Sequence, residues 1–165
     1  MIPEIEKVAS LPSSVSLAEI RSDRFDQFLA YWDSLRGAAF APGWKQFELW
    51  ALPPAIIPYI TVVDVHRDPL DFVYRFFGTG QTNRKGIDWT GKSLQSFPVQ
   101  RGPSAFDEYR WVVDNKRPLT ISDMVVFENA YSNRVPFEQH SLRLPLSDDG
   151  QEVTQIVSLA IWDKK

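Results

Sequence analysis

Large apolar side chains recur at the spacing of one helical face near the start of the chain. A serine able to cap a helix precedes them and Gly37 follows them, so the pattern predicts an amphipathic helix over residues 22–37. Residues 1–21 form a lead-in to it that contains proline and serine. So wide an apolar stripe has to be buried, and we expect an interface with the rest of the chain or with a second copy. Its members are Phe25, Phe28, Leu29 and Trp32.

Five further segments have the β-branched, apolar or alternating composition of strands. Turn residues at 66–71 join the first two, and the Asp-Gly step at 149–150 is a strong hairpin signal between the last two. Ahead of the third strand, residues 103–115 predict a helix that begins near Pro103 and ends before Pro118. The predicted strands span residues 59–65, 72–77, 119–127, 137–146 and 153–162.

Strands that are separated by a helical block predict one antiparallel sheet with helices on one face. The last strand is apolar on both of its faces, so we expect both faces of the sheet to be buried. The helix over residues 22–37 is then the candidate cover for the second face. The expected fold class is α+β, with residues 38–165 forming one core domain.

Composition narrows the function classes. The chain has 165 residues, of which 44% are hydrophobic and 24% charged, as in an ordinary globular domain. It contains no cysteine, which excludes disulfides, zinc–thiolate sites and iron–sulfur clusters. The net charge of -3 without a strong basic block argues against a nucleic-acid partner. We see neither a signal-peptide pattern nor a stretch long enough to cross a membrane, so we expect a cytoplasmic protein without a membrane partner.

Short motifs along residues 24–162 resemble, in order and spacing, a bacterial PAS-like family of short, often single-domain proteins. This resemblance implies a PAS-like five-stranded sheet, a sensor or regulatory role in signal transduction, and a common tendency to form homodimers. It implies no catalytic residues. Light-sensing PAS relatives form a flavin adduct on a cysteine, which this chain lacks. The motifs are residues 30–37 (AYWDSLRG), 52–53 (LP), 57–58 (IP), 63–65 (VDV), 72–79 (FVYRFFGT), 90–94 (TGKSL) and 144–150 (LPLSDDG).

In a PAS-like fold a ligand pocket lies between the sheet and the helical block, and such pockets are mostly apolar with a few polar groups. Strand alternation places Tyr74 and Phe76 on one face and Arg75 and Phe77 on the other, and we expect the first pair to face inward. The candidate pocket residues are Tyr74, Phe76, Thr79, Trp89, Tyr109, Val113, His140, Leu142 and Ser158. The aromatic members among them are also compatible with plain core packing.

His140 is the most suggestive polar candidate, because alternation groups it with Leu142 and Leu144. It is either a pocket residue that responds to pH or a structural histidine whose ring is satisfied locally. His66 lies in a predicted turn and His140 on a strand, which disfavours haem, and no ligand spacing indicates a metal site. The sequence identifies no particular cofactor, so the cofactor is unknown at this point.

Arg75 offers a second choice between a ligand and a structural role. Its planar fork could clamp an acidic ligand, or it could form a salt bridge to Asp64 or Asp71 near the same hairpin.

Two functional hypotheses follow from the sequence. The first is a small-molecule-sensing or signalling module without its own output domain, which acts through dimerisation or through a partner protein. The alternative is a protein-interaction adaptor with a filled core and no ligand. We do not expect an enzyme, because no acid–base pair or nucleophile motif stands out.

Overall fold

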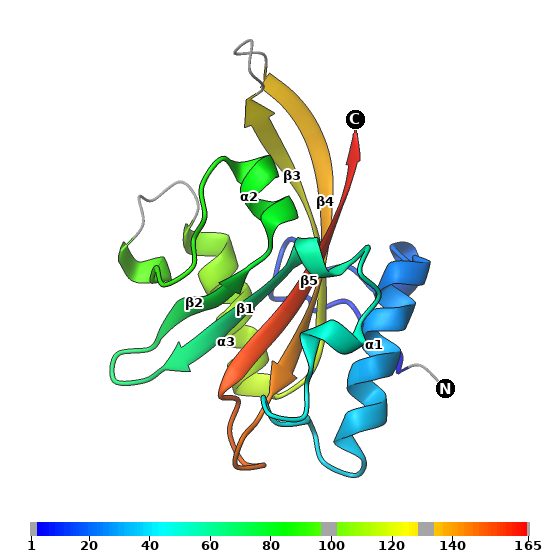
Figure 1. Ribbon diagram of the computed structural model, residues 1–165, viewed down its shortest axis with the longest axis vertical. Helices are drawn as coiled ribbons and strands as arrows, with labels where there is room; N and C mark the ends of the chain where they lie inside the picture. Colours follow the sequence, from blue (N-terminus) through cyan, green and yellow to red (C-terminus); the bar gives the residue numbers. More distant parts are fainter. Residues whose placement is uncertain (1–2, 97–101, 129–133, 165) are drawn as a thin grey trace.

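The computed structural model describes residues 3–96, 102–128 and 134–164, and its centre is a five-stranded antiparallel sheet (Figure 1). The strands lie in the order β2-β1-β5-β4-β3, so the chain passes from one edge of the sheet to the other between β2 and β3. This confirms the predicted fold class. The strands are β1 (Ile60–His66), β2 (Asp71–Phe77), β3 (Leu119–Glu128), β4 (Arg134–Leu146) and β5 (Gln155–Lys164).

Helices cover both faces of the sheet. In Figure 1, α1 lies on one side of it, whereas α2 and α3 lie on the other. Both long helices coincide with the segments that the sequence predicted. The helices are α1 (Asp23–Arg36), α2 (Thr79–Lys85) and α3 (Gly102–Asn115), with short 3-10 turns η1 (Leu17–Glu19), η2 (Leu49–Ala51), η3 (Ile57–Tyr59) and η4 (Leu94–Ser96).

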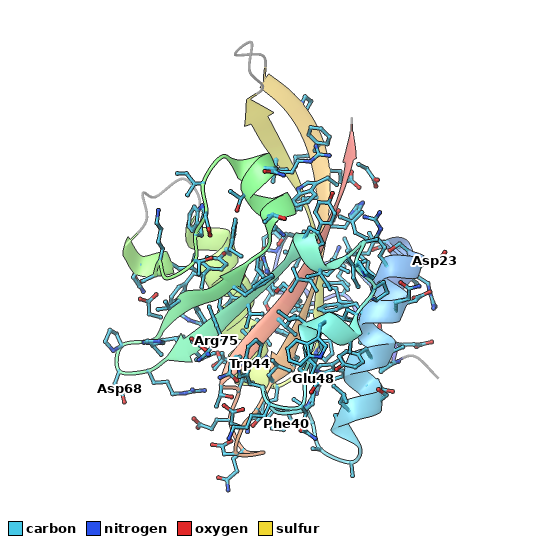
Figure 2. The ribbon with its side chains drawn as sticks, in the orientation of Figure 1. Asp23, Phe40, Trp44, Glu48, Asp68 and Arg75 are labelled. Atoms are coloured by element: carbon cyan, nitrogen blue, oxygen red, sulfur yellow. The ribbon has the colours of Figure 1, made fainter. Side chains whose placement is uncertain are left out.

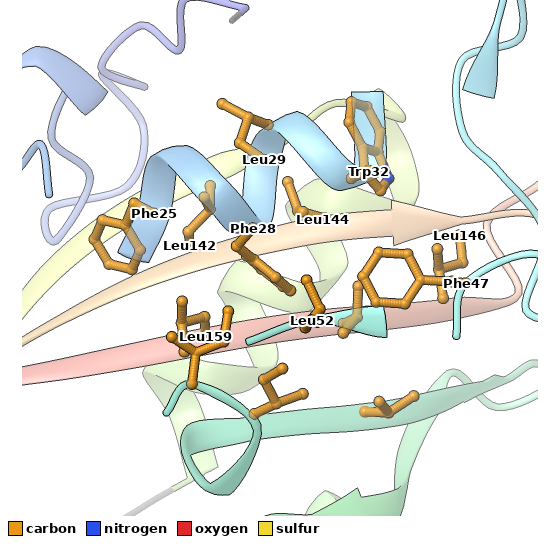
Figure 3. Packing of buried hydrophobic residues seen from close by; sticks show 14 of the residues in the cluster. Phe25, Phe28, Leu29, Trp32, Phe47, Leu52, Leu142, Leu144, Leu146 and Leu159 are labelled. Carbon is orange, nitrogen blue, oxygen red and sulfur yellow. The ribbon is translucent and has the colours of Figure 1, made fainter. Parts of the chain in front are cut away.

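The predicted apolar stripe of α1 is buried within the chain itself. Ser22 caps the helix by accepting a hydrogen bond from Phe25 N (3.2 Å), and Gly37 ends it with a positive φ of 59°. Phe28 and its neighbours pack on the apolar side chains of β4 and β5 (Figure 3). Trp32 also donates from Nε1 to Pro145 O at 2.8 Å. The stripe is therefore a helix–sheet interface, and its side chains are not available to a second copy.

A β-bulge changes which face the end of β2 presents. The pairing register shifts between Val62, which lies opposite Phe76, and Val63, which lies opposite Tyr74. The extra residue reverses the alternation beyond it. Phe77 therefore packs with Tyr74 on the α3 side, whereas Phe76 packs on the α1 side. The prediction that Tyr74 and Phe76 share a face was wrong.

The N-terminal lead-in follows the edge of the sheet. Val15 N donates to Thr120 O (3.1 Å) and Ser122 N donates to Ser13 O (2.9 Å), so this segment pairs with β3. Within the described residues, no helix is both long and apolar enough to span a membrane. The buried apolar side chains that flank the paired segment are Ile5 and Leu17.

Candidate ligand site

A charged side chain lies in the middle of the sheet, on the face that α3 covers. Arg143 of β4 donates from Nε (3.0 Å) and from Nη2 (2.8 Å) to Oε1 of Glu108 on α3. Arg143 is only 7% exposed and Glu108 only 2%. Removing both charges from water is costly, and it is offset only where the pair has good geometry and further hydrogen bonds.

The remaining groups of the guanidinium are also engaged. Arg143 Nη1 donates to the Tyr109 hydroxyl (3.1 Å) and to Ser158 Oγ on β5 (3.0 Å). The guanidinium carbon lies 4.4 Å from the centre of the Tyr109 ring, as in a cation–π contact. Glu108 Oε2 accepts a hydrogen bond from Ser13 Oγ at 3.2 Å, which joins the network to the lead-in. We call these five residues, Ser13, Glu108, Tyr109, Arg143 and Ser158, the interior network.

Protonation in the interior network follows from burial and from the neighbouring charges. Burial raises the pKa of Glu108, and the adjacent Arg143 partly opposes this. For Arg143, burial favours loss of the proton, but Tyr109 and Glu108 outweigh it and raise the pKa overall. Burial, with the nearby Tyr109, raises the pKa of Tyr74 well above its ordinary value, so this phenol stays protonated.

An aromatic cluster adjoins this network at the end of β2. The rings of Phe77 and Trp89 stack with their centres 6.4 Å apart, and Tyr74 meets both edge-on at 5.3 and 5.8 Å. Tyr74 and Trp89 were both predicted for the pocket, and the structure brings them together. Phe77 joins them because of the β-bulge.

The sheet divides the other predicted pocket residues between its two faces. The α3 side holds Tyr74, Trp89, Tyr109, Val113 and Ser158, whereas Phe76, His140 and Leu142 belong to the α1 side. Thr79 is exposed at the first residue of α2. A single pocket beneath α3 therefore excludes three of the predicted residues, and whether the others contact a ligand stays a prediction.

His140 lies on the same face as Leu142, as alternation predicted, but that face is the one that α1 covers. Its Nδ1 is 2.7 Å from Ser122 Oγ, and its Nε2 is 3.2 Å from both Asp163 Oδ2 and Glu138 Oε1. Two carboxylates at Nε2 favour a proton there, so Nδ1 accepts from Ser122 in the neutral ring. These contacts tie β3, β4 and β5 together and favour the structural interpretation of His140.

Arg75 likewise has a structural partner. Its Nε donates to Asp64 Oδ1 at 2.8 Å across the β1–β2 pair, one of the two salt bridges that the sequence suggested. Its guanidinium lies over the Trp44 ring at 5.4 Å (Figure 2). The side chain is exposed, so this pair contributes little to stability.

Sequence reasoning missed Arg143 and Glu108, although a signal for each was present. Arg143 alternates with Leu142 and Leu144, so burial of both sheet faces already implied a buried arginine. Glu108 lies four residues before Val112 on the buried face of α3. Each charge was identifiable alone, but only the tertiary structure pairs them.

A cleft of about 440 Å³ opens beside Glu108, where the lead-in crosses the edge of β3. Acidic and hydroxyl side chains contribute most of its polar lining. In the described part of the chain, no three or more histidine and acidic side chains are arranged to hold a metal ion. The cleft is lined by Leu11, Pro12, Ser13, Asp107, Glu108, Ser122, Asp123 and Met124.

The strand order, with the helical block between β2 and β3, is that of the PAS-like fold that the motifs predicted. No protein-family model matches the chain, and the comparison with curated proteins found no match. The chain is similar to solved LOV domains, which are PAS-family sensor domains, at low sequence identity and in fold alone.

Three of these solved structures illustrate the similarity. The LOV domain from Erythrobacter litoralis EL346 blue-light activated histidine kinase is 14% identical, over 64% of this chain and 95% of that one, with a TM-score of 0.43. A fungal LOV domain photoreceptor is 20% identical, over 62% and 72%, with a TM-score of 0.37. The Aureochrome1 LOV domain is 13% identical, over 63% and 80%, with a TM-score of 0.40.

Proposed function

We propose that this protein is a small-molecule-sensing or signalling module that acts through a homodimer or a partner protein. The observation that supports this proposal is the interior network beneath α3. A buried ion pair is often no more stabilising than apolar side chains of the same volume, so stability alone does not account for Arg143 and Glu108. A polar interior suits a site that orients a ligand.

The interior network also offers a physical route from the interior to the edge of the sheet. Ser13 donates to Glu108 through its side chain and accepts from Ser122 through its backbone. A ligand that moves α3 or Arg143 would alter the first bond and loosen the second. Ligand binding would in this way change how the lead-in pairs with β3, and a partner protein or second copy would sense that change.

The proposed activity is binding rather than catalysis. The charged groups of Arg143 and Glu108 are engaged by each other and by neutral hydroxyls. Neither is poised to move a proton to or from a substrate.

The adaptor with a filled core remains the second candidate. The mutual contacts among Tyr74, Phe77 and Trp89 favour it, because large rings that pack on one another fill the interior without a ligand. This candidate predicts that the protein binds other proteins and holds no small molecule.

Native mass spectrometry of the full chain, purified without denaturation, separates the two candidates. A sensor is expected to show a small molecule at one copy per subunit, together with the subunit number. The double variant Arg143→Met/Glu108→Met, which keeps an apolar and filled interior, is the matched control and is expected to lose that mass. A bare protein in every preparation overturns the sensing function and supports the adaptor.

A further inference from the structure

The outer edge of β3 is paired over only part of its length. β3 lies at the end of the sheet, and the lead-in bonds to it through Thr120 O (3.1 Å) and Ser122 N (2.9 Å). Every second residue of an antiparallel strand directs its backbone groups to the same side, so the N–H and C=O of Met124 face this edge too. Among the described residues, none bonds to them there. Beyond Ser122 the edge therefore presents a free donor and a free acceptor.

The lead-in leaves this edge at the point where the cleft opens. Ser14 N donates to Leu11 O at 3.0 Å, which turns the chain, and Pro12 has no N–H with which to continue the pairing. The cleft of about 440 Å³ is lined from both faces of β3, by Met124 on one face and by Asp123 on the other. Its volume lies in the range of ligand pockets. An extended chain laid along the free edge would have room there for a long side chain.

The charges that line the cleft are all negative. Asp107 of α3 and Asp123 of β3 contribute carboxylates, and among the described residues neither one has a hydrogen bond or a salt bridge. The third carboxylate, that of Glu108, is already paired with Arg143. Asp123 is half-buried, and no basic side chain contributes to the lining. We call this the acidic cleft, and its field favours a cation.

Charge also distinguishes between the possible occupants of the edge. A second copy that paired through β3 would bring its own Asp107 and Asp123 to the junction, and like charges there are destabilising. Adjacent residues of an added strand point to opposite faces, so a basic residue above Asp123 has neighbours on the side of Met124. Met124 is 56% exposed, and its flexible side chain suits apolar contacts. The edge therefore fits a basic residue between apolar ones.

We propose that the free edge of β3 and the acidic cleft bind an extended segment of a partner protein, which carries a lysine or arginine between apolar residues. This inference rests on the proposed function, in which a partner senses how the lead-in pairs with β3, and it specifies the chemistry of that partner. Strand addition supplies affinity through main-chain hydrogen bonds, and the acidic cleft supplies selectivity through the basic side chain.

Two blocked peptides test the selectivity. The probe is Thr-Val-Lys-Val-Thr, and its matched control has norleucine in place of lysine. Calorimetric titration of the full chain is expected to show about fivefold tighter binding of the lysine peptide, the ratio that a partly exposed charge pair supplies. Asp123→Asn should remove most of this preference. Glu48→Gln, which changes an exposed carboxylate ahead of η2, is the control variant and should keep it.

Hydrogen exchange at the Met124 amide separates strand addition from charge attraction alone. Saturating lysine peptide is expected to slow this exchange roughly fivefold to tenfold, because the amide gains an acceptor. N-methylation of every second peptide bond removes the peptide's donors on one edge. One of the two N-methylated registers should therefore bind more weakly and lose the protection. A concentration-dependent dimer in which the Met124 amide is protected without peptide overturns the proposal in favour of a second copy.

Failure of this inference is distinguishable from failure of the proposed sensing function. Equal affinity for the two peptides, or binding that leaves exchange at Met124 unchanged, overturns the docking surface, while a small molecule retained in native mass spectrometry still supports sensing. Conversely, a chain that retains no small molecule but prefers the lysine peptide keeps the docking surface and supports the adaptor. Should Asp123→Asn fail to fold, the two peptides on the wild-type protein decide the matter.

Discussion

Arg143 Nη2 and Glu108 Oε1 are 2.8 Å apart in the interior of the molecule, and together they join the centre of the sheet to α3. The two residues come from different elements, 35 positions apart in the chain. Each side chain is buried only because the other compensates its charge.

Removing one member of this pair is expected to destabilise the fold more than removing both. Arg143→Met leaves the Glu108 carboxylate buried without a counter-charge, which costs about 3–5 kcal/mol. Arg143→Met/Glu108→Met leaves no buried charge and should lie within about 1 kcal/mol of the wild type. Urea denaturation at pH 7 measures both variants. Equal losses in the single and double variants would contradict this account of the pair.

Asp123 and Asp88 are expected to change stability with pH in opposite directions. Burial raises the pKa of Asp123 in the folded protein, so the folded state holds its proton to higher pH than the unfolded state does. Its contribution to stability therefore falls as pH rises above about 4, the ordinary range of an aspartate. Asp123→Asn should gain stability relative to the wild type between pH 4 and neutrality, as measured by urea denaturation.

Asp88 is the control with the opposite sign. Hydrogen bonds from the side chain and backbone of Thr90 lower its pKa, so its stabilising contribution is present above the ordinary pKa and is lost as pH falls. Asp88→Asn should lose stability relative to the wild type at neutral pH and match it in acid. A change of stability in the same direction in Asp123→Asn and Asp88→Asn would contradict the opposite pKa shifts of the two carboxyl groups.

Gly78 precedes α2 and Gly86 follows it, and we expect the two positions to differ in how well they tolerate substitution by alanine. A Cβ on Gly78 would lie 2.2 Å from Pro58 O, so Gly78→Ala forces backbone to move and should cost about 3 kcal/mol. Gly86 has a φ of +80° but open space around it, so Gly86→Ala should cost about 1 kcal/mol. Chemical denaturation measures the free energy of unfolding of both variants. A milder effect at Gly78 would mean that α2 does not pack closely on the segment before β1.

Ser13→Ala is expected to loosen the lead-in without unfolding the core. Loss of the bond to Glu108 should speed hydrogen exchange at the amides of Val15 and Ser122 by roughly twofold to tenfold. Ser34→Ala, on the exposed side of α1, is the control and should leave both amides unchanged. Unaltered exchange in Ser13→Ala would show that the interior network does not hold the lead-in.

Trp32 is expected to contribute a specific hydrogen bond besides its buried area. Trp32→Phe leaves Pro145 O without the donor Nε1 and should cost about 2 kcal/mol. Trp50 is 78% exposed, so Trp50→Phe should change the free energy of unfolding by less than about 0.5 kcal/mol. Thermal denaturation compares the two variants, and similar losses would argue against the Trp32–Pro145 bond.

The apolar stripe of α1 shows what periodicity alone can predict. The spacing of Phe25, Phe28, Leu29 and Trp32 predicts both the helix and its buried face, because a 3.6-residue repeat depends only on local geometry. Periodicity does not say what the stripe packs against, and both the sheet and a second copy are compatible with it. The structure selects the sheet, since β4 and β5 present a matching apolar face.

The sequence by itself determined the elements, their order and the burial of both sheet faces, because these follow from local periodicity and turn chemistry. The tertiary structure decided which residues share the interior. A bulge that exists only when β1 and β2 pair moved Phe76 away from Tyr74 and replaced it with Phe77. The pairing of Arg143 with Glu108 also depends on tertiary structure, because packing between distant segments sets the partner of a buried charge.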